Sequence, residues 1–283
     1  MDAQSASAAT FEIRLPNGRA GPLVFASPHS GQRLPVDMRP APGLDQRDVR
    51  SAEDTAVDLL LDTAPDHGVP LICALVSRAY VDLNRSATEL DPVLTPDIPA
   101  HLLPTGAAGA RVASGYGVVA RRSGDGRDLY DRTVPLAEVR ARLTAVHAPY
   151  HNALSDLMRQ ARDSHGRALL VDWHSMPSDA AGSRGGPDVV LGNRHGAACE
   201  ARVTRKLKSV FEQAGWTVAM NRPYAGGYTT QVWGRPSEGF QAVQIELNRA
   251  LYLDEASRTL SPGFVRCRSV VARAMALMVA EFG

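Results

Sequence analysis

The chain has few cysteines and no long apolar run, and both absences narrow the class of protein. Its three cysteines are widely spaced and include no Cys-x-x-Cys pair, which argues against a disulfide framework and a structural zinc knot. No segment reaches the roughly 18 apolar residues of a membrane span. The N-terminus lacks the basic and apolar regions of a secretion signal. We therefore expect a protein of the reducing cytoplasm, without a membrane partner.

An excess of charge of either sign is also lacking. The formal net charge is +1, from 31 Lys and Arg residues against 30 Asp and Glu residues. A nearly neutral chain gives no reason to expect nucleic acid or an acidic membrane surface as a partner. The sequence contains neither a glycine-rich phosphate fingerprint nor a nucleophile elbow. With nucleic acid and membrane surfaces disfavoured, we expect the partner to be a small molecule.

Strand-like and helix-like patterns alternate along the chain, which favours an α/β sheet. Short apolar runs predict strands at 22–27, 70–76, 168–173, 187–192, 216–221 and 241–247. Helical spacing of apolar residues predicts helices at 51–67, 136–161, 197–214 and 263–281. The first of these helices would bury a stripe of Ala56, Leu59, Leu60 and Ala64. The proline- and glycine-rich region 86–130 is either a functional lid or insertion, or a poorly defined excursion with small elements of its own.

Three of the predicted strands lead to a polar residue that can bind a metal. These residues are His29, His174 and Glu246. Open α/β sheets bind ligands at the carboxyl ends of their strands, so the three can meet in one crevice. A lone histidine is more often structural than a ligand, but Asp172 and Ser175 flank His174. An adjacent acid suits the partner that orients a metal-bound imidazole. The pattern indicates a metallohydrolase.

A catalytic zinc needs a third protein ligand, and Glu53 and Asp54 are the candidates. The alternative is structural, because the run from Ser51 to Asp54 fits a helix capping box in which the acid satisfies a backbone N–H. An acid in the first turn also complements the helix dipole. Spacing alone slightly favours the cap over the metal.

Glu246 lies inside an apolar run, where an unpaired charge is costly. It is therefore either paired, with Arg249 three residues later as the partner, or functional. A functional Glu246 would be the base that removes a proton from metal-bound water.

Two segments that follow strands can bind a carboxylate, because arginine holds one with two parallel hydrogen bonds. They span 77–85 and 221–228. Their plainer interpretation is a surface ion pair between Arg78 and Asp82 and a hairpin turn at the Gly226-Gly227 pair. If the two segments instead bind the substrate, the residues that they contribute are Arg78, Asn84, Arg85, Arg222 and Tyr228.

Taken together, these motifs resemble the N-formylglutamate amidohydrolase family. The matching stretches run in order from about residue 20 to 255: Ser27–Gly31, Glu53-Asp54, Ser77–Arg85, Pro149-Tyr150-His151, Asp172–Pro177 and Asn221–Thr230. The combination is specific, although no single motif would be. The resemblance is looser between residues 87 and 122.

The resemblance implies one α/β hydrolase domain over residues 1–283, with a loop-rich insertion around 86–130. Its fold would be a mixed, largely parallel central sheet with helices on both faces, similar to zinc carboxypeptidases and aspartoacylases. The implied cofactor is one zinc ion, and relatives favour Asp54 over the cap. The implied metal ligands are His29, Asp54 and His174, and the implied catalytic base is Glu246. Asp172 and Ser175 would contact the ligands from behind. The implied substrate-binding residues are Arg78, Asn84, Arg85, Arg222 and Tyr228.

The implied reaction is hydrolysis of N-formyl-L-glutamate to formate and glutamate. One alternative keeps the metal but changes the substrate, which gives a deacylase or a carboxypeptidase-like peptidase acting on another N-acyl or peptide substrate. A second alternative is a binding or regulatory protein that keeps the fold without turnover. Metal content separates that last class from the enzymes, because a non-enzyme has no need for bound zinc.

Overall fold

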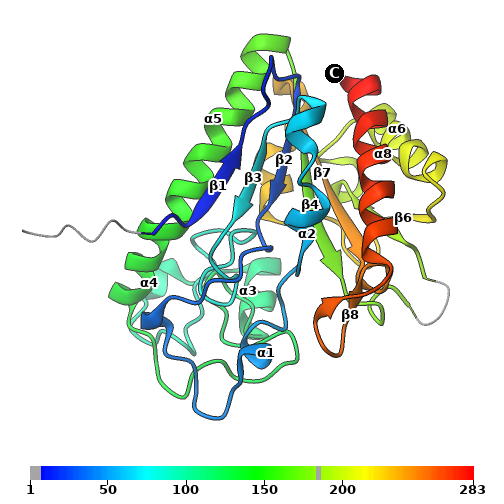
Figure 1. Ribbon diagram of the computed structural model, residues 1–283. Coiled ribbons are helices and arrows are strands. Elements are labelled where there is room, and N and C mark those ends of the chain that lie inside the picture. Colours follow the sequence, from blue (N-terminus) through cyan, green and yellow to red (C-terminus); the bar gives the residue numbers. More distant parts are fainter. Residues whose placement is uncertain (1–7, 183–185) are drawn as a thin grey trace, which may run out of the picture.

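A mixed seven-stranded sheet forms the centre of the computed structural model, which describes residues 8–182 and 186–283 (Figure 1). The strand order is β1-β3-β2-β4-β7-β5-β6. The four strands from β3 to β7 pair in parallel, while β1 and β5 are antiparallel to their neighbours β3 and β7. The strands are β1 Phe11–Arg14, β2 Leu23–Ser27, β3 Leu71–Ala74, β4 Ala168–Met176, β5 Val189–Gly192, β6 Val218–Met220 and β7 Phe240–Asn248. The predicted mixed, largely parallel sheet is confirmed.

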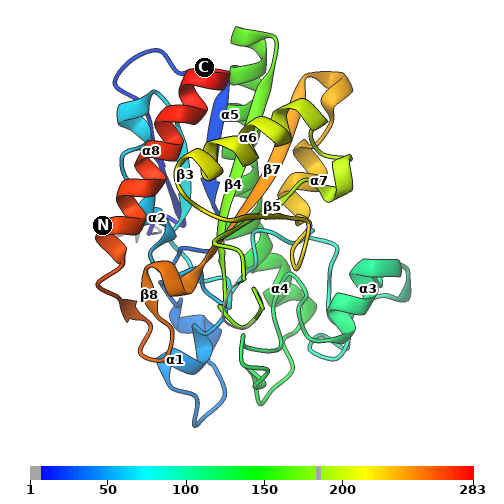
Figure 2. The ribbon, with the colours of Figure 1, turned by 90° about the vertical axis from the view of Figure 1, so that its right-hand side faces the viewer.

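Helices cover both faces of this sheet (Figures 1 and 2). One face packs against α2, α6 and α8, and the other against α4, α5 and α7. Strands β2 and β4 are buried along their whole length, which is why each begins with a short continuous apolar run. The helices are α1 Gln46–Val49, α2 Val57–Leu60, α3 Gly106–Ala113, α4 Leu136–Arg142, α5 Ala148–His165, α6 Ala201–Gln213, α7 Tyr228–Trp233 and α8 Phe264–Phe282.

Most of the predicted elements are confirmed. All six predicted strands form, and the predicted helices at 197–214 and 263–281 correspond to α6 and α8. The long helix predicted at 136–161 is continuous from α4 to α5, with a π-helical turn at Leu143–His147 between them. Features without a prediction include the edge strand β1, the short helices α1 and α7, and a small hairpin of β8 Leu253–Asp254 and β9 Thr259–Leu260.

The helix predicted at 51–67 is wrong. Only α2 and a 3-10 turn, Ala64–His67, form there, and Leu59 of the expected buried stripe is 44% exposed. No capping box forms from Ser51; the box in this region joins Asp45 and Asp48 at α1. The N–H of Asp54 donates to the carbonyl of His29 at 3.0 Å, which draws this segment to the end of β2 and away from helical geometry.

Residues 86–130 consist of loops with a 3-10 turn, Ala100–Leu102, and helix α3. Ion pairs of Glu89 with Arg111 and of Asp91 with Arg121 hold the region together. It lies beyond the carboxyl ends of the parallel strands, on the side where the site is found (Figure 2). Small elements of its own are therefore present. Across the described residues, no helix is long and apolar enough to cross a membrane.

Candidate active site

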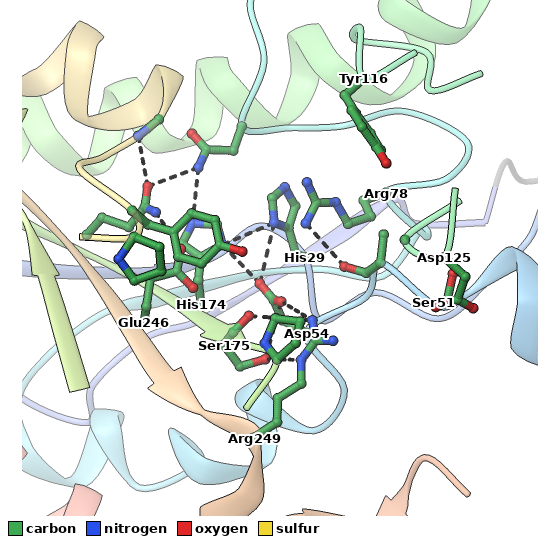
Figure 3. Close-up of a pocket in the computed structure, with 18 of the residues that line it drawn as sticks. His29, Ser51, Asp54, Arg78, Tyr116, Asp125, His174, Ser175, Glu246 and Arg249 are labelled. Carbon is green, nitrogen blue, oxygen red and sulfur yellow. Dashed lines mark hydrogen bonds and ion pairs between the residues drawn. The ribbon is translucent and has the colours of Figure 1, made fainter. Parts of the chain in front are cut away.

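A cavity of about 1030 Å³ opens at the carboxyl ends of the parallel strands (Figure 3). His29 lies two residues beyond β2, His174 lies on β4, and Glu246 lies on β7. His174 and Glu246 are register partners on adjacent parallel strands, so their side chains emerge side by side. The three residues that follow predicted strands therefore line the same cavity.

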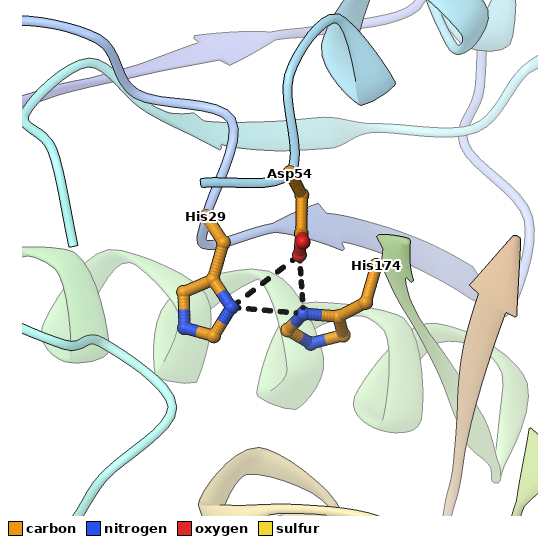
Figure 4. Close-up of side chains that lie close together, drawn as sticks. All are labelled: His29, Asp54 and His174. Carbon is orange, nitrogen blue, oxygen red and sulfur yellow. Dashed lines mark hydrogen bonds and ion pairs between the residues drawn. The ribbon is translucent and has the colours of Figure 1, made fainter. Parts of the chain in front are cut away.

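Asp54 joins the two histidines in a compact buried cluster (Figure 4). The Nδ1 atoms of His29 and His174 lie 3.0 Å apart. Oδ2 of Asp54 lies 2.9 Å from Nδ1 of His174 and 3.4 Å from Nδ1 of His29. Ligands of a tetrahedral zinc with bonds of 2.0–2.1 Å are about 3.3 Å apart, which is close to these spacings.

The outer nitrogens of both rings contact carboxylates. Nε2 of His29 lies 2.7 Å from Asp82, and Nε2 of His174 lies 3.1 Å from Asp172. A carboxylate accepts a proton donor, so these contacts favour rings protonated at Nε2 and leave the Nδ1 lone pairs facing Asp54. Three acceptors that converge in a buried space repel one another unless a cation lies between them. The donor set therefore fits a divalent metal ion.

The two adjacent acids of the 53–54 pair have different surroundings. Glu53 turns away from the histidines, accepting hydrogen bonds from Ser77 and Arg50. Asp54 accepts from Oγ of Ser175 at 3.3 Å and from Arg249 at 3.1 Å. Burial alone would raise the pKa of Asp54, but protons on His29 and His174 hold that pKa well below the usual range when no metal ion lies between the three side chains. Asp54 is thus the ionised member that faces the cluster.

Glu246 is buried beside the cluster, and Arg249 is not its partner. Nε2 of Gln244 donates to Oε1 of Glu246 at 2.6 Å, while Arg249 pairs with Asp54. Within the described parts of the chain, no cation lies within salt-bridge distance of Glu246. Burial raises its pKa to about 7, with the charge of His174 opposing and that of Asp54 reinforcing the rise. The alternative of a structural Glu246–Arg249 pair is wrong.

The predicted substrate-binding residues divide into two groups. Arg78, Asn84, Arg85 and Tyr228 line the cavity, whereas Arg222 is exposed and lies outside its lining. Arg78 forms the ion pair with Asp82 that the plainer interpretation predicted, at 2.6 Å, although Asp82 is buried. Arg85 donates only to backbone carbonyls, of Tyr116 and Asn84. Among the described residues, no carboxylate lies within salt-bridge distance of Arg85.

The amide of Asn84 is occupied within the protein. Its oxygen accepts from the N–H and hydroxyl of Thr229, both at 3.0 Å, and its nitrogen donates to Gln244 at 3.3 Å and lies 3.2 Å from Nε2 of His174. Gly227 packs so closely that a Cβ there would collide with this amide. The Gly226-Gly227 pair leads directly into α7, so the predicted hairpin turn is wrong. Asn84 links the cluster to β7 and α7.

Three residues support the site in ways that the sequence analysis did not predict. Asp82 orients His29, Gln244 holds Glu246, and Arg249 joins Asp54 to Ser175. Only Gln244 had a local signal, because residues two apart on a strand share a face. The predicted second layer, Asp172 and Ser175, contacts His174 and Asp54 respectively.

Comparison with known proteins points to one family. The model of the family described as N-formylglutamate amidohydrolase matches residues 21–253. The chain is 32% identical over 244 residues to an N-formylglutamate deformylase of Pseudomonas aeruginosa strain PAO1, covering 83% of each chain. It is 32% identical over 241 residues to the Pseudomonas putida protein of the same name, covering 83% of this chain and 82% of the relative.

A solved structure gives the same result. The crystal structure of an N-formylglutamate amidohydrolase from Ralstonia eutropha JMP134 superposes with a TM-score of 0.90 at 32% sequence identity. The match covers 97% of this chain and 98% of that chain. The similarity therefore extends through the sheet, its helices and the loops around the cavity.

Proposed function

Because the chain belongs to the N-formylglutamate amidohydrolase family, we propose that it hydrolyses N-formyl-L-glutamate to formate and glutamate with the help of a bound metal ion. The observation that carries the proposal is the His29-Asp54-His174 cluster with Glu246 beside it in the same cavity. We place this activity in one α/β hydrolase domain, with residues 86–130 as an insertion that adds Glu89, Arg111 and Tyr116 to the cavity lining.

Zinc is the metal that this donor set suits, and His29, Asp54 and His174 would hold it. When bound, a zinc ion supplies a water of lowered pKa and polarises the amide carbonyl. Asp82 and Asp172 fix the two rings through their Nε2 atoms. Ser175 and Arg249 fix Oδ1 of Asp54, so that Oδ2 faces the histidines. Every proposed ligand thus has its own buried partner.

Glu246 is the proposed general base. Gln244 occupies its Oε1 atom, and this leaves Oε2 to accept a proton from the attacking water. A base works best when its pKa lies near the working pH, and that of Glu246 is raised to about 7 by burial. Glu246 then passes the proton to the nitrogen of glutamate as the C–N bond breaks, and the formyl carbon leaves as formate.

Arg85 is the residue best placed to bind a substrate carboxylate. It lines the cavity, and its guanidinium bonds only to carbonyls, which leaves its positive charge uncompensated by direct contact. Burial lowers the pKa of Arg85, but an arginine remains protonated at any working pH. Arg78 already neutralises Asp82, and Asn84 is fully bonded, so we assign both a supporting role.

A deacylase or carboxypeptidase-like peptidase remains the second candidate, because one observation favours it. The cavity of about 1030 Å³ is at the upper end of the roughly 300–1,000 Å³ typical of small-molecule sites. It has room for an acyl group or a peptide larger than a formyl group on glutamate.

Side-by-side kinetics test the proposal. The zinc-loaded protein is assayed with N-formyl-L-glutamate, N-acetyl-L-glutamate, a glutamyl dipeptide and N-formyl-L-glutamine, the last differing from the first only by a neutral side chain. We expect the highest kcat/KM for N-formyl-L-glutamate. A higher value for the acetyl or peptide substrate would support the second candidate instead. Equal values for the glutamate and glutamine substrates would contradict a site built for an acidic side chain.

A further inference from the structure

Two histidines outside the metal cluster lie side by side, with tilted rings in contact, on the helix behind the site. His147 ends the π-helical turn, and His151 follows one turn later in α5. Their ring centroids are 4.2 Å apart, with an angle of 41° between the rings. His151 belongs to the Pro149-Tyr150-His151 motif, to which the proposed reaction assigns no role. Side chains four apart on a helix share a face, so both rings point the same way.

Each of these histidines donates to a carbonyl of the same loop. Nε2 of His147 donates to the carbonyl of Arg85 at 2.9 Å, and Nε2 of His151 donates to the carbonyl of Leu83 at 3.0 Å. A carbonyl only accepts, so Nε2 carries the proton in both rings. Burial lowers the pKa of both side chains, and the neighbouring His147 helps to lower that of His151 to about 3. Both rings therefore stay neutral near pH 7.

The two carbonyls flank Asn84 in a segment that supplies three groups to the site. Asp82 contacts His29, Asn84 contacts His174, and the side chain of Arg85 lines the cavity. The segment lies in no strand or helix. The backbone N–H of Asp82 donates to the carbonyl of Val118 at 2.8 Å. The carbonyls of Leu83 and Arg85, further along the segment, accept from the histidine pair.

The same pair also supports Tyr228, one of the aromatic side chains on the cavity wall. The Tyr228 ring lies 5.2 Å from the ring of His151 and 6.0 Å from that of His147. The π-helical turn inserts one residue before α5 and so sets the face on which both histidines lie. Such turns are frequent at functional sites. A helix, a loop and the first residue of α7 thus meet at the two neighbouring histidine rings.

We propose that His147 and His151 are positioning residues that aim the guanidinium of Arg85 at a carboxylate of the substrate and hold the ring of Tyr228 in the cavity wall. This inference rests on the proposed function, in which Arg85 binds that carboxylate. A histidine suits the task because its flat ring packs against its neighbour while its N–H donates to a carbonyl. Neither histidine touches the reacting atoms.

Steady-state kinetics on N-formyl-L-glutamate test the proposal with three variants of the zinc-loaded protein. H151F keeps a flat ring but loses the donor, while H151Q keeps a donor that reaches the position of Nε2. H165F is the matched control, because His165 donates from the same helix to the carbonyl of Ala20 at 3.0 Å, at the end far from the cavity. H147F replaces H151F if the latter does not fold.

We expect H151F to raise KM about tenfold or more, the loss from one misplaced charged hydrogen bond, while kcat changes less than about threefold. H151Q should restore KM to near the wild-type value, and H165F should leave it unchanged. In an R85A background, H151F should add little further to KM, since residues that act through one another are non-additive. A purely structural role predicts lowered thermal stability and additive effects instead.

The outcomes separate this inference from the reaction on which it rests. A wild-type protein that does not turn over N-formyl-L-glutamate overturns the proposed function. An active wild type whose H151F and H147F variants keep a normal KM overturns the positioning role alone. An equal rise of KM in H165F, or full additivity with R85A, also overturns that role.

Discussion

Replacement of Glu246 by glutamine tests the role of the base most cleanly. The amide has the size of the carboxylate, and its oxygen can still accept the hydrogen bond that Gln244 donates at 2.6 Å. Glu246 is outside the His29-Asp54-His174 cluster, so the variant should keep its metal. An amide cannot take a proton from water. Loss of a general base reduces turnover by about 10²–10⁴, which corresponds to about 3–5 kcal/mol of transition-state stabilisation.

The assay measures kcat on N-formyl-L-glutamate together with metal content per chain. Glu238→Gln, on the exposed turn before β7, is the matched control and should behave like the wild type. Burial raises the pKa of Glu246 to about 7, and the base acts only when ionised, so kcat/KM should rise with pH through about 7 and then level off. The Glu246→Gln variant should lose this rise. Normal turnover in the variant would remove Glu246 from the mechanism, and loss of metal would make it a ligand.

Three further predictions concern the surroundings of the base. Asp54→Ala should lose its bound metal on dialysis, while Glu53→Ala keeps it; retained metal with a lowered melting temperature would make Asp54 structural. Asp82→Asn should weaken metal affinity by about 10–100-fold in a chelator competition, since Asp82 orients His29, and unchanged affinity would refute that role. Arg85→Ala should raise KM for N-formyl-L-glutamate about tenfold or more with a smaller change in kcat, whereas an unchanged KM would exclude Arg85 from carboxylate binding.

The sheet was predictable because its strands are buried. Strand β4 has no exposed face, and its first half, Ala168–Val171, is an apolar run that is visible in the local sequence. Strand β1 has four residues, none fully buried, at the edge of the sheet, and its short pattern gave no such signal. The helix predicted at 51–67 failed because the N–H of Asp54 bonds to the carbonyl of His29. A tertiary contact overrode a local stripe.

The sequence alone predicted a site residue only where a pattern within a single element pointed to it. The approach of His29, His174 and Glu246 followed from their positions after buried strands. Asp54 as a ligand came from the family resemblance, because its spacing fitted a cap as well. The role of Asp82 depends on a contact 53 residues away, and that of Arg249 on one 195 residues away. No periodicity within a single element encodes such pairs.

Removal and return of the metal tests the central claim most directly. The purified protein is stripped with a chelator, assayed on N-formyl-L-glutamate, and assayed again after titration with zinc. The account predicts that turnover disappears in the stripped protein and returns as zinc fills the His29-Asp54-His174 cluster, with saturation at one zinc ion per chain. Undiminished turnover in protein shown to be free of metal would contradict it.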